Sequence, residues 1–212
     1  MAIKITESTT STKESILDHS LTLFSERGYD GVSMRDIAAS VGIKAASVYN
    51  HFKSKEDIFV CIIEGMTIRY EQMVQSIQMP SGDMESVAEQ YMRVSGESLG
   101  QMAKELFRYF LKDDYASKFR RMLTVEQLKS ERASQVYHSF FIDGAIDFQK
   151  SLFGSMMKQG SFIDCDPHIM ALHFYSPIFL MLNQYDNKPE REQEALDILD
   201  KHIKQFLRVY KK

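Results

Sequence analysis

The chain contains few of the residues that build disulfide-bonded or membrane-spanning proteins. It has two cysteines, Cys61 and Cys165, in 212 residues. They lie far apart in the sequence, so we expect buried thiols rather than a disulfide framework. No apolar run approaches the length that crosses a bilayer, and residues 1–11, rich in Thr and Ser, lack the apolar stretch of a signal peptide. We therefore expect a cytoplasmic protein with no membrane partner, whose first 11 residues form a disordered arm.

Helix breakers are also scarce, since the chain has four prolines and ten glycines. No segment shows a sustained alternation of apolar and polar residues, which excludes a large sheet and predicts an all-α fold. The composition, 44% hydrophobic and 26% charged, is ordinary for a globular protein, and the net charge is −3. A chain of this length can bury a sizeable core in one or two domains.

Apolar residues at helical spacing predict nine or ten helices. The breaks between them fall at turn-forming residues such as those at 79–82, which read Met-Pro-Ser-Gly. The expected helices cover about 12–27, 34–41, 45–51, 55–78, a fifth opened by Asp83 and interrupted near Gly96 and Gly100, then 115–128, 131–159, 167–185 and 189–210.

Residues 33–55 have the pattern of two short helices joined by a tight turn. Ser33 and Asp36 form a capping pair, because the hydroxyl can accept from a free backbone N–H and the carboxylate suits the positive helix start. Gly42 tolerates a positive φ and can end the first helix. Together these features predict a helix-turn-helix, which places its second helix in the major groove of DNA.

The local charge of this segment differs from that of the whole chain. Residues 31–55 carry Arg35, Lys44, Lys53 and Lys55 against a single acid, Asp36. A basic patch on a slightly acidic protein indicates binding to phosphate. Three capped short helices without such a function are the alternative, and the charge pattern argues against it.

From about Ile16 to Phe59 the chain resembles the DNA-binding domain of the tetracycline-repressor (TetR) family of bacterial transcriptional regulators. The resemblance covers about a fifth of the chain, and the remainder is similar to the family in length and helical layout. The residues that carry it are Leu23-Phe24-Ser25-Glu26-Arg27-Gly28-Tyr29, Val32-Ser33-Met34-Arg35-Asp36-Ile37-Ala38, Val41-Gly42-Ile43, Ser47-Val48-Tyr49, His51-Phe52 and Lys53-Ser54-Lys55-Glu56.

The resemblance implies roles for individual residues. Phosphate contacts are implied for Ser33, Tyr49, His51 and Lys55, and we add Arg35 from the basic patch. Positions facing the groove are implied for Lys44, Ala45, Ala46, Ser47 and Asn50, while Phe52 is implied as a core residue. This chain departs from the family at Lys44, where a small capping hydroxyl is common, and at Ala45, where a basic residue is common.

The resemblance also implies a domain organisation and a homodimer. We expect an arm at 1–11, a DNA-binding domain at 12–56 and a helical regulatory and dimerisation domain at 57–212. Residues 167–185 are apolar nearly all round, with Pro177 expected to kink the helix, so they need cover on several sides. With the last helix they predict a four-helix dimer interface, the alternative being a monomeric core. The expected interface residues are Tyr175, Phe179, Leu182, Leu199, Ile203 and Phe206.

Aromatic and methionine side chains concentrate in the expected regulatory domain. They can repack around an apolar ligand, although such stripes also form plain core. One face of the helix expected at 131–159 carries Tyr137, Phe141, Ala145, Phe148, Leu152 and Met156. A polar handle on the ligand would meet Gln127, His138 or His173. The predicted ligand-binding residues are Phe107, Phe110, Met122, Gln127, Tyr137, Phe141, Phe148 and Phe174.

The sequence therefore predicts a homodimeric repressor that binds a palindromic DNA operator and is released by a small apolar or amphipathic molecule. A transcriptional activator and a partner-binding helical module remain alternatives. No catalytic activity or cofactor is expected. Residues 96–100, Gly-Glu-Ser-Leu-Gly, match an esterase nucleophile motif around Ser98, but that motif needs a strand before the serine and the preceding residues have helical spacing.

A metal site is not expected either. The sequence groups Asp164, Cys165, Asp166, His168 and His173, but their spacing has no recognised ligand register. Instead we expect Asp166 to cap the helix that begins at Pro167.

Overall fold

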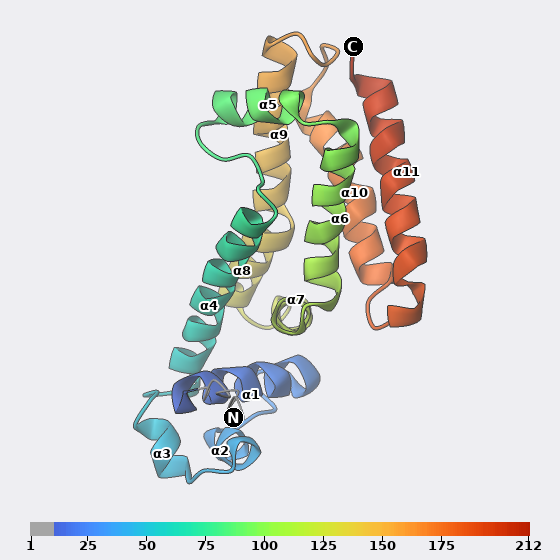
Figure 1. Ribbon diagram of the computed structural model, residues 1–212. Helices are drawn as coiled ribbons and strands as arrows, with labels where there is room; N and C mark the ends of the chain where they lie inside the picture. The colour runs from blue at the N-terminus through green and yellow to red at the C-terminus, as the bar shows by residue number, and fades with distance from the viewer. Residues whose placement is uncertain (1–10) are drawn as a thin grey trace, which may run out of the picture.

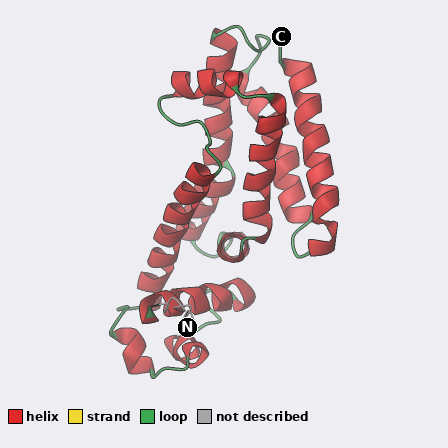
Figure 2. Ribbon diagram, in the orientation of Figure 1, coloured by secondary structure: helices red, strands yellow, loops and turns green. Residues whose placement is uncertain are grey.

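The structure is a computed structural model that describes residues 11–212. The expected arm, apart from Ser11, lies outside the described residues. In residues 11–212 the regular secondary structure is helical, with one isolated bridge between Phe162 and Lys211 (Figure 2). The all-α prediction is confirmed.

Eleven α-helices and one short 3-10 helix follow one another through residues 11–212. Helices α1 to α3 form a small unit at one end of the elongated molecule, and α4 leads from it to the larger bundle (Figure 1). The bounds are α1 Thr12–Arg27, α2 Met34–Val41, α3 Ala45–Tyr49, α4 Lys55–Ser76, α5 Met84–Arg93, α6 Gly96–Lys112, α7 Asp114–Glu126, α8 Glu131–Phe141, α9 Asp143–Lys158, α10 Pro167–Gln184, the 3-10 helix Pro189–Arg191 and α11 Glu192–Tyr210.

The expected helix starts in the small unit are confirmed by their capping bonds. Ser33 and Asp36 form a reciprocal capping box at α2, and Ser11 with Glu14 does the same at α1. Gly42 ends α2 with φ 77°, in the left-handed region. These contacts join residues three or four positions apart, so local sequence determines them.

Two expected helices are compared with the structure where their boundaries were in question. The prediction of one continuous helix over 131–159 is wrong. Helices α8 and α9 separate at Ile142, whose φ and ψ are −125° and −85°. There the backbone passes so close that a Cβ on Gly144 would lie 2.0 Å from the carbonyl oxygen of Ser139. The helix opened by Asp83 is interrupted near Gly96 as expected, since α5 ends at Arg93 and Ser95 caps α6, but α6 continues through Gly100. Helix α10 likewise runs through Pro177.

The hydrophobic core does not stop at the end of the small unit. Ile16, Phe24 and Ile62 of α1 and α4 belong to the same buried cluster as Phe119 and Met122 of α7. Two further clusters lie in the bundle, one among α5, α9, α10 and α11 and the other among α6, α10 and α11. The small unit and α7 therefore share one hydrophobic core.

Candidate functional site

The helix-turn-helix exposes most of the residues predicted to bind DNA. Val48 and Phe52 are buried and hold α3 against α1 and α2, as the sequence predicted for Phe52. Ala45 and Ser47 are half-buried, and Ala45 packs against the core rather than facing outward. The exposed predicted residues are Ser33, Arg35, Lys44, Ala46, Tyr49, Asn50 and His51.

The side chains of Ser33 and Lys44 differ in whether they already form hydrogen bonds within the protein. The Ser33 hydroxyl accepts from the backbone N–H of Asp36 and donates to the Asp36 carboxylate, so it is engaged in the cap. Lys44 precedes α3 at the N-cap position, and its side chain makes no capping bond. Its ammonium is therefore available to a ligand that approaches the start of α3.

Lys55 has a different environment from the one expected of a phosphate contact. Its ammonium donates to the carbonyl oxygens of Tyr29 at 2.6 Å and Val32 at 2.8 Å. The same nitrogen lies 4.1 Å from the centre of the Tyr29 ring, at cation–π distance. Two of its three N–H donors are thus used inside the protein. We correct the predicted role of Lys55 to that of a clamp between α4 and the α1–α2 loop.

Replacing Lys55 with methionine is expected to lower the stability of the protein. The change leaves two carbonyl groups without their donor, which costs about 1–3 kcal/mol, and the melting temperature should fall by about 2–4 °C per kcal/mol. Thermal unfolding followed by circular dichroism measures the effect. The matched control is Lys53→Met, an exposed lysine two residues away. An unchanged melting temperature with weaker DNA binding would restore the phosphate role.

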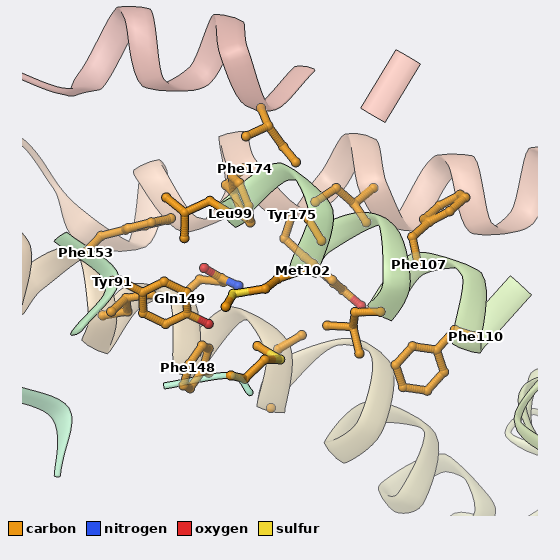
Figure 3. Close-up of a pocket in the computed structure, with 18 of the residues that line it drawn as sticks. Tyr91, Leu99, Met102, Phe107, Phe110, Phe148, Gln149, Phe153, Phe174 and Tyr175 are labelled. Carbon is orange, nitrogen blue, oxygen red and sulfur yellow. The ribbon is translucent and has the colours of Figure 1, made fainter. Parts of the chain in front are cut away.

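The bundle encloses a cavity of about 560 Å³, a volume that suits a small molecule. Helices α4, α5, α6, α8, α9, α10 and α11 all contribute to its wall. Figure 3 shows that the labelled side chains around it are mainly aromatic and aliphatic. Among the predicted ligand-binding residues, those that line the cavity are Phe107, Phe110, Phe141, Phe148 and Phe174.

Three predicted ligand-binding residues lie elsewhere. Met122 is buried in the core that joins α7 to the small unit, and Tyr137 packs against Phe141 outside the cavity wall. Gln127 follows α7 and donates to the carbonyl of Thr124 at 3.2 Å. Their prediction as cavity residues is wrong, because an apolar stripe on a helix does not reveal whether core or cavity covers it.

The predicted polar handles are also wrong. His138 faces Asp143 on the surface at 3.2 Å, and His173 pairs with the hydroxyl of Tyr210. Gln149 and Tyr91 are polar cavity residues that the sequence did not predict, and both side chains point into the space (Figure 3). A signal existed, because Gln149 is four residues after Ala145 and three before Leu152, and both of these line the cavity.

The predicted dimer residues face inward. Leu182, Leu199, Ile203 and Phe206 are buried within the protomer and line its cavity, so their prediction as interface residues is wrong. Tyr175 lines the cavity too, and its hydroxyl donates to the carbonyl of Phe141 at 2.8 Å. Phe179 is half-buried against the core shared with the small unit.

The outer sides of α10 and α11 also carry exposed aliphatic residues. Ile169 and Leu180 lie on α10, and Leu180 is 64% exposed. Ile198 and Val209 lie on α11 and are likewise exposed. This group of four is called the outer α10–α11 face below.

A polar connection joins α7 to the small unit. Glu126, the last residue of α7, is 2% exposed, and its carboxylate accepts from the backbone N–H of Tyr29 at 3.0 Å. The same carboxylate also accepts a hydrogen bond from the Lys129 ammonium at 3.1 Å. The Tyr29 hydroxyl donates to Glu56 at 3.2 Å, and Glu56 pairs with Arg132 of α8 at 2.6 Å. Tyr29 is thus bound from both α7 and the start of α4.

The remaining chemical motifs have structural explanations. Ser98 lies in the first turn of α6, where its backbone N–H donates to the capping hydroxyl of Ser95 at 3.1 Å, and helix α5 precedes it where an esterase requires a strand. Asp166 caps α10 as predicted, accepting from His168 N–H at 2.8 Å. Within residues 11–212 no group of three or more potential ligands is placed to hold a metal. No helix of this part of the chain is long and apolar enough to cross a bilayer.

The comparison with known sequences concerns the small unit. Residues 16–61 match the family model described as bacterial regulatory proteins of the tetR family. Over 47 residues the chain is 57% identical to the biofilm operon icaADBC HTH-type negative transcriptional regulator IcaR of Staphylococcus aureus (strain Newman) and 53% identical to that of Staphylococcus epidermidis. The match covers 22% of this chain and 25% of each of these relatives, so it spans about a quarter of their length.

Solved structures are similar over nearly the whole chain. A putative TetR-family transcriptional regulator from Mesorhizobium loti MAFF303099 superimposes with a TM-score of 0.65 at 22% identity, covering 94% of this chain and 96% of that one. SmeT, the repressor of the Stenotrophomonas maltophilia multidrug efflux pump SmeDEF, gives 0.63 at 20% identity, covering 97% and 93%. A SmeT–triclosan complex gives 0.63 at 21% identity, covering 96% and 93%. At these identities the likeness shows a common fold.

Proposed function

We propose that this chain, whose residues 16–61 match the tetR family of bacterial regulatory proteins, is a homodimeric repressor that a small molecule releases from its operator. The observation that carries the proposal is the exposed helix-turn-helix face packed onto a bundle with an internal cavity. The matched relative IcaR is a negative regulator and the structural neighbour SmeT is a repressor, which supports repression over activation. This family consists of DNA-binding regulators rather than enzymes.

DNA recognition is assigned to the exposed residues around α3. Lys44, Ala46 and Asn50 would face the major groove, with Lys44 free to reach a guanine edge. Tyr49, His51, Arg35 and the N-terminus of α2 at Ser33 would contact the backbone. Ser47 is half-buried and would reach the groove only with its hydroxyl. Ala45 packs inward, so we assign it no base contact.

Dimerisation is assigned to the outer α10–α11 face. Its aliphatic side chains would meet those of a second copy in a four-helix arrangement about a two-fold axis. Two protomers related in this way present two α3 helices to successive major grooves, which are about 34–36 Å apart. The operator is therefore expected to be a palindrome.

Release is assigned to the cavity. Helix α4 contributes both to the cavity wall and, at its start, to the small unit, where Glu56 binds Tyr29. A ligand that fits one placement of α4 and α8 better than another would shift the population toward it. The separation of the two α3 helices, and with it DNA affinity, then changes.

The proposal is tested by selection from random double-stranded DNA at near-physiological salt, with sequencing of the bound pool. We expect a two-fold motif. Lys44→Ala should then relax the preference at one position of each half-site, at a cost of about 1–3 kcal/mol, because a bidentate base contact is lost. The control is Lys53→Ala, an exposed lysine after α3 that should leave the preferred sequence unchanged.

Each other result of the selection has a definite meaning. A folded dimer that enriches no sequence contradicts the proposal and favours a partner-binding module. A motif that activates a reporter placed downstream of it contradicts repression while leaving DNA binding intact. Equal effects of Lys44→Ala and Lys53→Ala would assign Lys44 to the DNA backbone.

A further inference from the structure

The cavity wall carries almost no formal charge. Among the described residues that line it, Glu71 is the single one that is charged at neutral pH. Glu71 lies on α4 and is exposed to solvent, so it belongs to the mouth rather than the interior. An ionised group that entered the cavity would lose its hydration without meeting an opposite charge, which is costly.

The mouth lies between α4 and the α8–α9 junction. Thr67 and Glu71 on one side, and Ser139 and Gly144 on the other, are cavity residues that solvent reaches. The opposite end is formed by buried side chains of α6 and α11, such as Phe107 and Leu199. A ligand therefore enters beside α4, and its apolar part lies toward α6 and α11.

Neutral hydrogen-bonding groups line the part between these ends. The Gln149 carboxamide and the Tyr91 hydroxyl point into the space in Figure 3. Neither side chain forms a hydrogen bond within residues 11–212, whereas the Tyr175 hydroxyl is already bound to Phe141. Burial raises the pKa of Tyr91 to about 12, so its hydroxyl stays protonated and can donate.

We infer that the cavity takes an uncharged amphiphile, with an apolar body toward α6 and α11 and one neutral hydrogen-bonding head, such as a hydroxyl or carbonyl, at Gln149 and Tyr91. The inference deepens the proposed function and rests on it for the effect on DNA. The head gains bonds that a purely apolar ligand lacks, and it has no charge to bury. A carboxylate head would meet Glu71 at the mouth and no cation in the wall.

Three amphiphiles of equal chain length test the inference on the full-length protein. The neutral fluorescent probe N-phenyl-1-naphthylamine is displaced with 1-decanol, decanoate or decyltrimethylammonium at pH 7.5, below their aggregation limits. Decanol is expected to displace the probe at a concentration at least about tenfold lower than either charged compound, since charge burial is penalised more than hydrogen-bond loss.

Variants locate the head group. Gln149→Leu should lower the affinity for decanol about 2- to 12-fold, which is the effect of losing one neutral hydrogen bond. The affinity for the probe should be unchanged. Gln72→Leu is the matched control, because Gln72 is an exposed residue of α4 that does not line the cavity. Equal responses of the two variants would contradict the assigned position of the head.

Other outcomes overturn the inference or separate it from the proposed function. Tighter binding of decanoate overturns it, as does tighter binding of decyltrimethylammonium that is lost in Glu71→Gln, which would place a cationic head at the mouth. A folded protein that binds none of the three also overturns it. Decanol that displaces the probe but leaves operator binding unchanged upholds the ligand class and contradicts release by this ligand.

Discussion

Replacing Leu180 with aspartate is expected to convert the protein into a monomer and to weaken binding to a two-fold operator by at least about 100-fold. Leu180 is 64% exposed on the outer α10–α11 face, together with Ile169. A carboxylate buried there against a second copy would have no partner. A monomer engages one half-site and loses the gain of about 10²–10⁴ that linking two binding modules supplies.

Leu128→Asp is the matched control for this prediction. Leu128 is 87% exposed after the end of α7, outside the outer α10–α11 face. Light scattering after size-exclusion chromatography gives the mass, and titration of full-site and half-site DNA gives the affinity. Binding of half-site DNA by Leu180→Asp should equal that of the parent protomer. A dimer that persists in Leu180→Asp would show that another surface joins the protomers.

The inward position of the predicted dimer residues shows what a periodic pattern leaves undecided. The stripe of Leu199, Ile203 and Phe206 on α11 is real, and all three are buried. A stripe states that one side of a helix must leave water, but the same pattern results from a protomer's own core and from a partner. Helix α10 is apolar nearly all round, so its sequence does not show which side faces the protomer's own core and which side faces a partner.

Features with short-range causes were predictable in detail. The caps at Ser33 and Ser54 and the left-handed Gly42 follow from residues a few positions apart, whereas the burial of Phe52 was implied by the family resemblance. The break at Ile142 was missed although Gly144 lies two residues after it. The backbone at Gly144 approaches the carbonyl of Ser139, five residues earlier, too closely for a Cβ, and the helical spacing of the apolar residues hid this local signal.

The candidate site divides in the same way. Exposure of Tyr49, Asn50 and His51 follows from the helix-turn-helix pattern, and their DNA contacts remain predictions. The position of Lys55 could not be predicted, because its two carbonyl partners lie more than 20 residues earlier in the chain. Glu126 was missed because its partner, Tyr29, is 97 residues away.

Replacing Glu126 with alanine is expected to reduce the effect of ligand on DNA affinity. Its carboxylate holds the backbone N–H of Tyr29 at 3.0 Å, where the small unit meets α7. Earlier in α7, the guanidinium of Arg120 lies 2.7 Å from the carboxylate of Asp186, which follows α10. The Nε of Arg120 also donates to the carbonyl of Phe110, a cavity residue, at 3.4 Å. Helix α7 thus contacts both the cavity wall and the α1–α2 loop, so Glu126 is placed to transmit a shift.

The loss of this acceptor has two measurable effects. It leaves a backbone N–H and the Lys129 ammonium without their partner, so unfolding should require about 1–3 kcal/mol less free energy. Coupling between two sites is typically about 1–3 kcal/mol, so the ratio of operator affinities without and with ligand should fall from about 5–150-fold toward unity. Thermal unfolding and operator titration with saturating ligand measure the two.

Glu126→Gln separates the two contributions of the side chain. It keeps an oxygen that accepts from Tyr29 N–H but removes the charge that Lys129 neutralises, so the ligand response should persist while stability falls. If Glu126→Ala is destabilised yet keeps the full response, the signal does not pass through the contact of α7 with Tyr29. It would then depend on α4, which connects the cavity wall directly to the helix-turn-helix.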